Sequence, residues 1–179
     1  MECHIEDENN QETKFIIIVV HMKAFGDAQS RARRHLASDI LDEIIDDIRD
    51  REDIPIVLGG DFNENLDNQV LSALKTSPDL FSLTLDDAST DALSYVGGRY
   101  RSLIDHIIVS RDAQIGNISG DDAAILRLDR SVRDFADHVP IVFRMVYRDD
   151  GINVAPPVSD SVVPVNIPEG ATKVRLNFD

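Results

Sequence analysis

The chain contains almost no cysteine and no long apolar segment. Cys3 is the only cysteine among 179 residues, so no disulfide can form within the chain and a disulfide-stapled secreted scaffold is excluded. The longest uninterrupted apolar run, Phe15 to Val20, is far shorter than the ~20 residues of a membrane helix, so no transmembrane segment is predicted. No basic segment followed by an apolar one opens the chain, so no signal peptide is predicted. The compartment stays open, a secreted parent protein included.

Positive charge is also scarce. The chain has 18 Lys and Arg against 33 Asp and Glu, a formal net charge of −15. A basic field that would hold nucleic acid by counterion release is therefore missing at the level of the whole chain, which disfavours passive DNA binding. Acidic clusters do bind hard cations, so metal-assisted phosphate chemistry stays open. Otherwise the composition, 42% hydrophobic and 28% charged, is that of a soluble globular domain.

Hydrophobic periodicity predicts strands that alternate with helices early and dominate later. The β-branched run 15–20 is typical of a strand buried on both faces. In 30–51, apolar residues recur at helical spacing and predict an amphipathic helix with an acidic outer face (Leu36, Ile40, Leu41, Ile44, Ile45, Ile48). A second buried strand follows at 54–58, and Asp67 is placed to cap a shorter helix. Further strands are predicted at 80–85, 103–109, 124–128 and 139–147. The pattern indicates an α/β domain with a mixed sheet.

The ends of the chain differ in composition from its middle. Residues 1–13 are polar and mostly acidic, and we expect a mobile lead-in there. Residues 14–148 carry the alternating pattern and form the domain. In 149–179 stand four of the seven prolines, which indicates a linker, and 167–178 reads as the start of a further β module.

Polar residues gather where the predicted strands end. His21 ends the first strand, and Asp61 and Asn63 follow the second. Strand ends at one edge of an α/β sheet are where ligands bind. Asp105 stands inside an apolar strand, where a charge is costly unless a cation or a histidine partners it.

Each of these features also has an ordinary structural interpretation. His21 can be a surface histidine, and the Asp61–Asn63 segment can be a capped turn. Asp105 can pair with Arg99 or Arg101. Asp137 can cap a loop. The arginines at positions 31, 33 and 34 are more typical of ion pairs within a helix than of a phosphate clamp.

Four short motifs, which follow one another along the chain, favour a functional interpretation of these residues over the structural one. His-x-Lys follows a buried strand at 21–23, Gly-Asp-Phe-Asn stands at 60–63, Ile-Asp-His-Ile at 104–107, and Asp-His-x-Pro at 137–140. This series resembles the endonuclease/exonuclease/phosphatase (DNase I-like) superfamily. The resemblance covers about residues 15–148 and implies the C-terminal half of a two-sheet α/β sandwich, a mixed sheet flanked by helices.

The resemblance also implies roles. His21 matches a histidine that hydrogen-bonds the scissile phosphate, and Asp61 an aspartate that positions the attacking water close to the metal. Asn63 matches an asparagine that donates to a phosphate oxygen. His138 matches a second catalytic histidine and Asp105 the aspartate that orients it. Asp137 matches a metal-binding carboxylate. His106 stands at a position that varies in the family, so no role is assigned to it.

Converging carboxylates also point to a cation on physical grounds. At an effective dielectric near 20, two carboxylates 4 Å apart repel by about 4 kcal/mol, and a divalent ion turns this cost into binding. Oxygen ligands with retained waters suit Mg²⁺ or Mn²⁺. The resemblance implies that Asp61 and Asp137 are the metal ligands.

The resemblance covers only the C-terminal half of the family domain, and no segment of this sequence matches the N-terminal half. In the family that half carries the glutamate that is the principal metal ligand. Gln11-Glu12 reproduces its dipeptide but follows no apolar run, so the role is not transferred. We therefore expect the chain to require the N-terminal half and to show weak turnover, or none, alone.

The expected function is a divalent-metal-dependent phosphodiesterase or endonuclease acting on DNA or RNA. A phosphatase or lipid phosphodiesterase, of the inositol phosphate or sphingomyelin type, is the alternative among enzymes. A catalytically silent binding module is the alternative of another class.

Overall fold

The computed structural model describes residues 1–6, 12–52, 54–84, 93–97, 99–110, 123–125, 136–143 and 174–176. The predicted helix and the two buried strands form one β-α-β unit. Strand β2 (Glu12–His21) runs parallel to β3 (Ile56–Asp61), and helix α1 (Ala28–Arg49) connects them. Asp27 caps α1, since its side chain accepts a hydrogen bond of 2.9 Å from the Ser30 amide.

A six-stranded mixed sheet is built around this unit in the order β4-β5-β3-β2-β1-β8. The added strands all pair antiparallel: β1 (Glu2–Glu6), β4 (Leu80–Ser82), β5 (Asp105–Ser110) and β8 (Val174–Leu176). A 3₁₀ turn, η1 (Gln69–Leu71), and a short helix, α2 (Ser72–Thr76), accompany α1. The predicted mixed sheet is confirmed.

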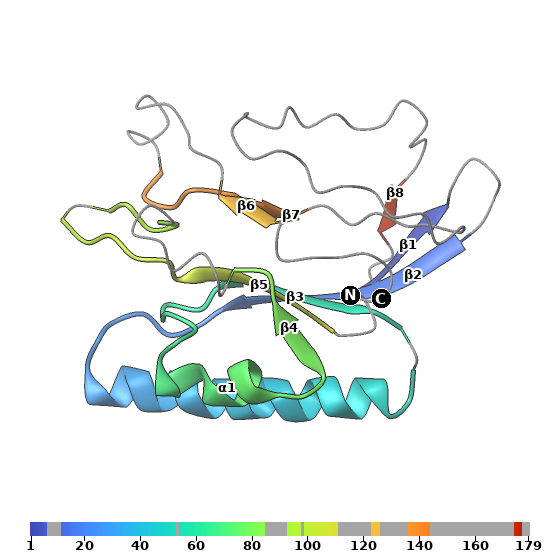
Figure 1. The fold of residues 1–179 in the computed structure, drawn as a ribbon, viewed down its shortest axis with the longest axis horizontal. Helices are drawn as coiled ribbons and strands as arrows, with labels where there is room; N and C mark the ends of the chain where they lie inside the picture. The colour runs from blue at the N-terminus through green and yellow to red at the C-terminus, as the bar shows by residue number, and fades with distance from the viewer. Residues whose placement is uncertain are drawn as a thin grey trace.

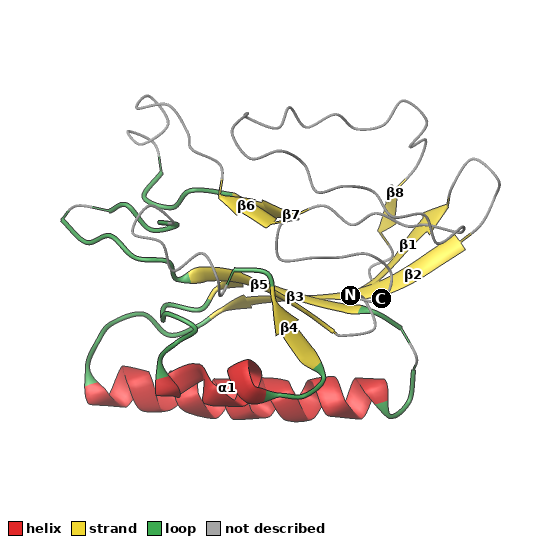
Figure 2. Ribbon diagram, in the orientation of Figure 1, coloured by secondary structure: helices red, strands yellow, loops and turns green. Residues whose placement is uncertain are grey.

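A second, two-stranded sheet lies on the face opposite α1. It consists of β6 (Ala123–Ile125) and β7 (Ile141–Phe143), paired antiparallel. Figure 1 shows three layers, with the helices below the large sheet and β6–β7 above it. The same layering is seen by secondary structure in Figure 2. The two-sheet α/β arrangement expected from the sequence is thus present.

The alternation of side chains along the strands divides the core in two. On the helix side, buried residues of the sheet pack against α1, η1 and α2 (Ile45, Ile56, Leu58, Leu71, Leu74, Ile108). On the other side, a smaller cluster lies under β7, with Ile141 packed against it (Cys3, Phe15, Val57, Leu83, Ile107, Val109). The site described below lies at one end of this second face.

The two ends of the chain differ from the expectations. The mobile lead-in predicted for 1–13 is wrong for the described part, because β1 pairs with β2 and Cys3 is buried against Phe15. Glu2 is exposed, and its carboxylate oxygen Oε1 lies 3.8 Å from Lys14 Nζ. Likewise Val174–Leu176 joins the main sheet beside β1 instead of opening a separate module. The rest of 149–179 lies outside the described residues.

Three local expectations are corrected. Asn68, not Asp67, caps η1, since its side chain accepts from the Val70 amide at 3.2 Å. The β2 strand is not buried on both faces, because Val19 is 75% exposed. On α1, three of the predicted inward residues are exposed (Leu36, Ile40, Ile44).

Within the part of the chain that the structure describes, no helix has the length and apolarity to cross a membrane.

Candidate active site

Strand register places three predicted site residues in one row across the sheet. His21 of β2 lies beside Asp61 of β3, and Asp61 lies opposite Asp105 of β5. Because side chains alternate along strands, residues paired in this way point to the same face. The row lies where β2 and β3 both end. Three side chains from separate stretches of sequence are therefore held together by backbone pairing alone.

His138 approaches this row from the segment before β7. Its backbone forms an isolated bridge with Tyr95, whose ring lies 5.0 Å from the imidazole. The His138 Nδ1 lies 2.9 Å from Asp105 Oδ2, and its Nε2 lies 3.8 Å from Asp61 Oδ2. An Nδ1–H that donates to Asp105 turns Nε2 toward Asp61. This is the orientation that the sequence resemblance implies for the pair.

Asp61 lies between two imidazoles. Besides His138, His21 Nε2 lies 3.5 Å from Asp61 Oδ2. The His21 side chain is 77% exposed, whereas those of Asp61 and Asp105 are 17% and 19% exposed. The carboxylates thus form the floor of the site, and His21 stands at its solvent-facing rim.

Asn63 holds Asp61 in place. Its amide N–H donates to Asp61 Oδ1 at 2.8 Å, and its side-chain Nδ2 donates to Asp61 Oδ2 at 2.9 Å and to the Met22 carbonyl at 3.1 Å. The residue adopts a left-handed backbone with φ of 51°, which Asn tolerates better than most residues. Both side-chain amide hydrogens are taken, so here Asn63 positions Asp61. Donation to a phosphate oxygen stays a prediction and requires one of these bonds to open.

The residues suit a divalent cation. One ligand atom from each of Asp61, Asp105 and His138 can be chosen so that all lie within 4.8 Å of one another. The two carboxylates supply oxygen donors of the kind that Mg²⁺ and Mn²⁺ prefer, and their side chains are screened from bulk water. Asp137 does not belong to this group, and its side chain is exposed. Its assignment as a metal ligand stays a prediction.

Ser94 is a supporting residue that the sequence interpretation missed. It is fully buried, and its hydroxyl accepts from the amides of Ile104 at 3.0 Å and Asp105 at 2.9 Å. Its carbonyl accepts from the Val139 amide at 2.6 Å. Ser94 therefore ties the Asp105 backbone to the segment that carries His138. A lone serine in a loop carries no sequence signal for this role.

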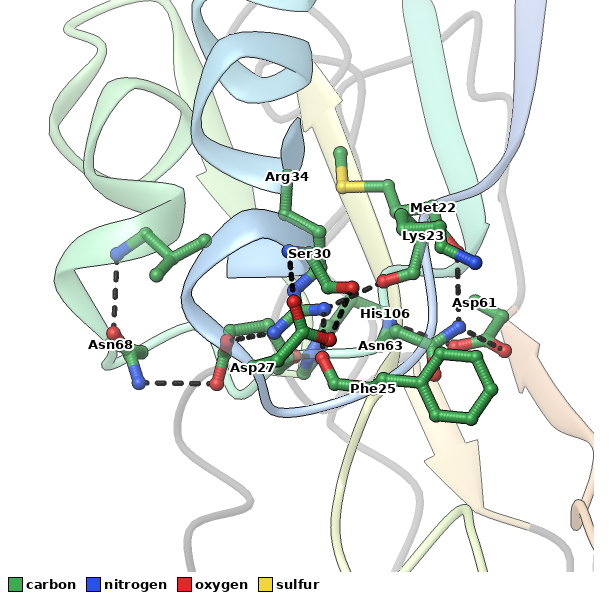
Figure 3. A network of polar contacts seen from close by, with 12 residues as sticks. Met22, Lys23, Phe25, Asp27, Ser30, Arg34, Asp61, Asn63, Asn68 and His106 are labelled. Carbon is green, nitrogen blue, oxygen red and sulfur yellow. Dashed lines mark hydrogen bonds and ion pairs between the residues drawn. The ribbon is translucent and has the colours of Figure 1, made fainter. Parts of the chain in front are cut away.

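A buried polar network behind the site was missed as well (Figure 3). Arg34 of α1 is 2% exposed and pairs with Glu64 at 2.8 Å. Its Nη1 also donates to the carbonyls of Lys23 at 2.6 Å and Phe25 at 2.8 Å. The expectation of an ion pair within the helix is wrong for Arg34, because its partner lies 30 residues away. Arg34 joins the loop after His21 to the loop after Asp61.

His106 completes this network from the sheet side. Its Nε2 lies 2.9 Å from the Glu64 carbonyl and its Nδ1 lies 3.1 Å from Thr84 Oγ1. Since a carbonyl only accepts, Nε2 carries the hydrogen and Nδ1 accepts from the threonine hydroxyl. Burial lowers the pKa of His106 to about 4, despite the opposing effect of the Glu64 carbonyl. His106 is thus a neutral structural histidine.

Solved structures share this architecture. The catalytic domain of APE2 from Xenopus laevis matches with a TM-score of 0.56 at 14% identity, over 79% of this chain and 52% of that one. An endonuclease/exonuclease/phosphatase family protein from Bacteroides thetaiotaomicron matches with a TM-score of 0.50 at 20% identity, over 75% and 48%. The fold is that of the endonuclease/exonuclease/phosphatase superfamily. A mannosyl-6-phosphatase from the same bacterium also has this fold, with a TM-score of 0.50 at 21% identity, over 73% and 52%.

The chain spans about half the length of the endonuclease/exonuclease/phosphatase-fold structures it matches. No model of a protein family matches its sequence, and no curated protein does. At this level of identity the likeness is one of fold. The case for an activity therefore depends on the site itself.

Proposed function

We propose that the protein is a divalent-metal-dependent phosphoester hydrolase whose substrate is a phosphodiester of DNA or RNA. The observation that carries the proposal is the position of Asp61, which lies between His21 and His138 while Asp105 holds the second imidazole. The Asp61 carboxylate can accept a proton from an attacking water. The two imidazole N–H groups beside it can donate hydrogen bonds to an anionic phosphoryl group. Solved structures of the same fold include proteins described as an endonuclease/exonuclease/phosphatase family member and a phosphatase, which supports the reaction class.

Each side chain has a defined task in this proposal. Asp61 orients the attacking water and accepts its proton, and Asn63 keeps the carboxylate pointed into the site. His138, as an imidazolium hydrogen-bonded to Asp105, donates from Nε2 to a phosphoryl oxygen. His21 donates to the same group from the exposed rim. Asp61 and Asp105 would hold the cation, which when bound offsets charge that develops on the phosphoryl oxygens.

The N-terminal half of the domain is part of the proposal. With His138 donating to the phosphoryl group, Asp61 and Asp105 are the two described residues left to hold the ion, fewer than the six ligands of octahedral Mg²⁺. Waters supply some of the remainder. We propose that a further carboxylate from the N-terminal half supplies another, and that this half is needed for full activity.

A phosphatase acting on a small substrate is the second candidate. The likeness to a mannosyl-6-phosphatase favours it, as does a net charge of −15, which gives no attraction to a polyanion. Cleavage of bis-p-nitrophenyl phosphate and p-nitrophenyl phosphate without nicking of plasmid DNA would select this candidate. Absence of all three activities, with metal bound, would select the silent binding module.

The test is nicking of supercoiled plasmid by the full natural protein with Mg²⁺, with and without EDTA. We expect EDTA to abolish nicking and Asp61→Ala to slow it about 10²- to 10⁴-fold. Asp47→Ala, which removes an exposed carboxylate from α1, is the control and should nick at the normal rate. Nicking that survives in Asp61→Ala would remove the site assignment.

Metal binding is measured separately by thermal unfolding of the 179-residue chain with increasing Mn²⁺. We expect the ion to raise the Tm of the wild type and of Asp47→Ala, and to leave the Tm of Asp61→Ala unchanged. Equal shifts in all three proteins would place the metal elsewhere.

A further inference from the structure

The loop between β2 and α1 holds an aromatic side chain out in solvent at an unfavourable backbone conformation. Phe25 is 71% exposed and has a φ of 81°. For a bulky residue without functional constraint, positive φ is an outlier, and glycine is the usual choice. Gly26 stands next to it, yet the left-handed conformation falls on Phe25. The loop would have less backbone strain if the positive φ fell on Gly26 instead of Phe25.

The strain is maintained by the buried Arg34. Its guanidinium binds the carbonyls of both Lys23 and Phe25 from the inside of the fold, and Glu64 holds it in place. Figure 3 shows the guanidinium enclosed by the loop and the Phe25 ring directed away from it. With these two carbonyls turned inward, the side chains of residues 23 and 25 are turned outward. Strained conformations held in this way cluster at binding and catalytic sites.

The exposed ring has a cation beside it. The Lys23 ammonium lies 4.9 Å from the centroid of the Phe25 ring. The pair is attached to the site, since Lys23 follows His21 by two residues and the Met22 carbonyl between them accepts from Asn63. An aromatic face and an ammonium thus stand together on the loop that directly follows His21.

A single exposed aromatic residue is common and by itself means little. Here the exposure is combined with backbone strain, a buried arginine that maintains it, an adjacent cation and a position next to the proposed catalytic row. Burying the ring in the core would have required none of these features. The combination favours a ligand that offers a planar ring next to an anion.

We propose that Lys23 and Phe25 form a subsite for the nucleoside next to the scissile phosphate, an inference that rests on the proposed phosphodiesterase function. The base stacks on the exposed face of Phe25, and Lys23 pairs with the adjoining phosphate. Every base has a π-face, so the subsite tolerates any sequence and selects unpaired bases over paired ones. The substrate class that follows is single-stranded nucleic acid or a locally opened duplex.

The first test uses the absence of tryptophan from the chain. Phe25→Trp introduces a single fluorophore at the subsite, and His35→Trp, at a side chain 54% exposed on α1, is the matched control. Both variants are titrated in EDTA with oligothymidylate, with an abasic sugar-phosphate oligomer of equal length and with inorganic phosphate. We expect oligothymidylate alone to quench the fluorescence, and only in Phe25→Trp. Absence of quenching, equal quenching by the abasic oligomer, or equal quenching in the control would overturn the subsite.

The second test separates binding from structure. Phe25→Gly removes the ring and relieves the positive φ, so we expect an unchanged or higher Tm together with oligothymidylate binding weakened about 5- to 150-fold. Anisotropy of a labelled oligonucleotide measures this binding without turnover. Unchanged affinity in Phe25→Gly would contradict the subsite.

Failure of the subsite and failure of the proposed function give different results. If Asp61→Ala nicks plasmid normally while Phe25→Trp is still quenched, the catalytic assignment fails and the nucleic-acid subsite stands. If Asp61→Ala is inactive while Phe25→Gly binds and cleaves as the wild type does, the catalytic assignment stands and the subsite is wrong.

Discussion

Asp105 interrupts an otherwise apolar strand, and the structure accounts for its charge. Its carboxylate lies 2.9 Å from His138 Nδ1, and its backbone amide donates to Ser94. A partly buried carboxylate satisfied in this way can fix the ring orientation and tautomer of the histidine. The costly placement is thereby explained by one neighbour 33 residues away.

The Asp105→Asn variant tests this orientation. The amide retains the shape of the side chain but does not stabilise an imidazolium, and it can present N–H to Nδ1 and favour the wrong tautomer. We expect kcat to fall about 10²- to 10⁴-fold with KM little changed. Steady-state hydrolysis of bis-p-nitrophenyl phosphate by the full natural protein measures both constants. Asp67→Asn, at an exposed position, is the control, and equal kinetics in the two variants would contradict the role.

His106 predicts a pH dependence of stability. Its pKa in the folded protein, about 4, lies below the ordinary value of 6.5. The unfolded chain therefore binds the proton first, and the contribution of His106 is complete above about pH 6.5 and is lost as the pH falls toward 4. The shift corresponds to a loss of about 3 kcal/mol over this range as an upper value.

Urea unfolding of the wild type and His106→Gln at pH 7.5 and pH 4.5 measures this contribution. We expect the free energy of unfolding of the wild type to fall more steeply toward acid than that of the variant. His35→Gln removes an exposed histidine and should follow the wild type. Parallel pH profiles for the wild type and His106→Gln would show that His106 is not buried neutral.

The residues at strand ends were predictable, and those that support them were not. His21, Asp61 and Asp105 stand out because polar side chains interrupt or end apolar runs. Arg34 gave no such signal, and the sequence predicted an ion pair within the helix, whereas in the structure Arg34 is buried on the same face of α1 as Ser30 and Ser38. Its partner Glu64 lies 30 residues away, and no local pattern indicates such a pairing.

At the scale of elements, the close approach of β2 and β3 depends on Gly60. Its φ is 137°, and a Cβ placed there would lie 2.1 Å from the Val20 carbonyl oxygen. At Gly59 the nearest atom to an added Cβ, the His106 carbonyl oxygen, lies 3.6 Å away, which is ordinary contact. The two neighbouring glycines therefore have different reasons to be present.

Gly60→Ala and Gly59→Ala form a matched pair. We expect Gly60→Ala to lose about 1–3 kcal/mol from backbone strain alone, with more from the clash, and to displace Asp61. Gly59→Ala should remain close to the wild type in stability. Chemical denaturation measures both, and similar losses in the two variants would contradict the strand packing described here.

The elements that could be predicted are those whose pattern is strong and local. The β-branched run predicted β2 and the helical spacing predicted α1, and the predicted bounds of both elements agree with the structure within a few residues. The β1 strand was missed because it is polar and short, and it is stabilised by pairing with β2. A short polar strand of this kind obtains its order from the strands on either side of it, here β2 and β8, and not from its own composition.

At the scale of the whole molecule, the chain leaves large apolar side chains uncovered. Val19 beside the site is 75% exposed, and Leu36, Ile40 and Ile44 follow one another at four-residue spacing along α1 with 60%, 44% and 44% exposed. The matched structures are about twice as long as the part that this chain spans. One half of a two-sheet sandwich has apolar surface that the other half would cover.

The isolated chain should therefore self-associate. We expect light scattering after size exclusion to give masses above that of the 19.9 kDa monomer, increasing with concentration. Leu36→Glu combined with Ile40→Lys should reduce the association if the helix stripe drives it, and Val19→Thr should do so if the sheet face does. A monomer with a sharp two-state unfolding transition would contradict this view of the chain.

The central claim is that Asp61 and His138 act in one catalytic unit, and a double-mutant cycle on plasmid nicking by the full natural protein in Mg²⁺ tests it most directly. Residues that act as a unit are not additive, so we predict that Asp61→Ala, His138→Ala and the double variant lose nicking activity to nearly the same degree, within about tenfold of one another. Losses that multiply in the double variant, or nicking that persists in either single variant, would contradict the account.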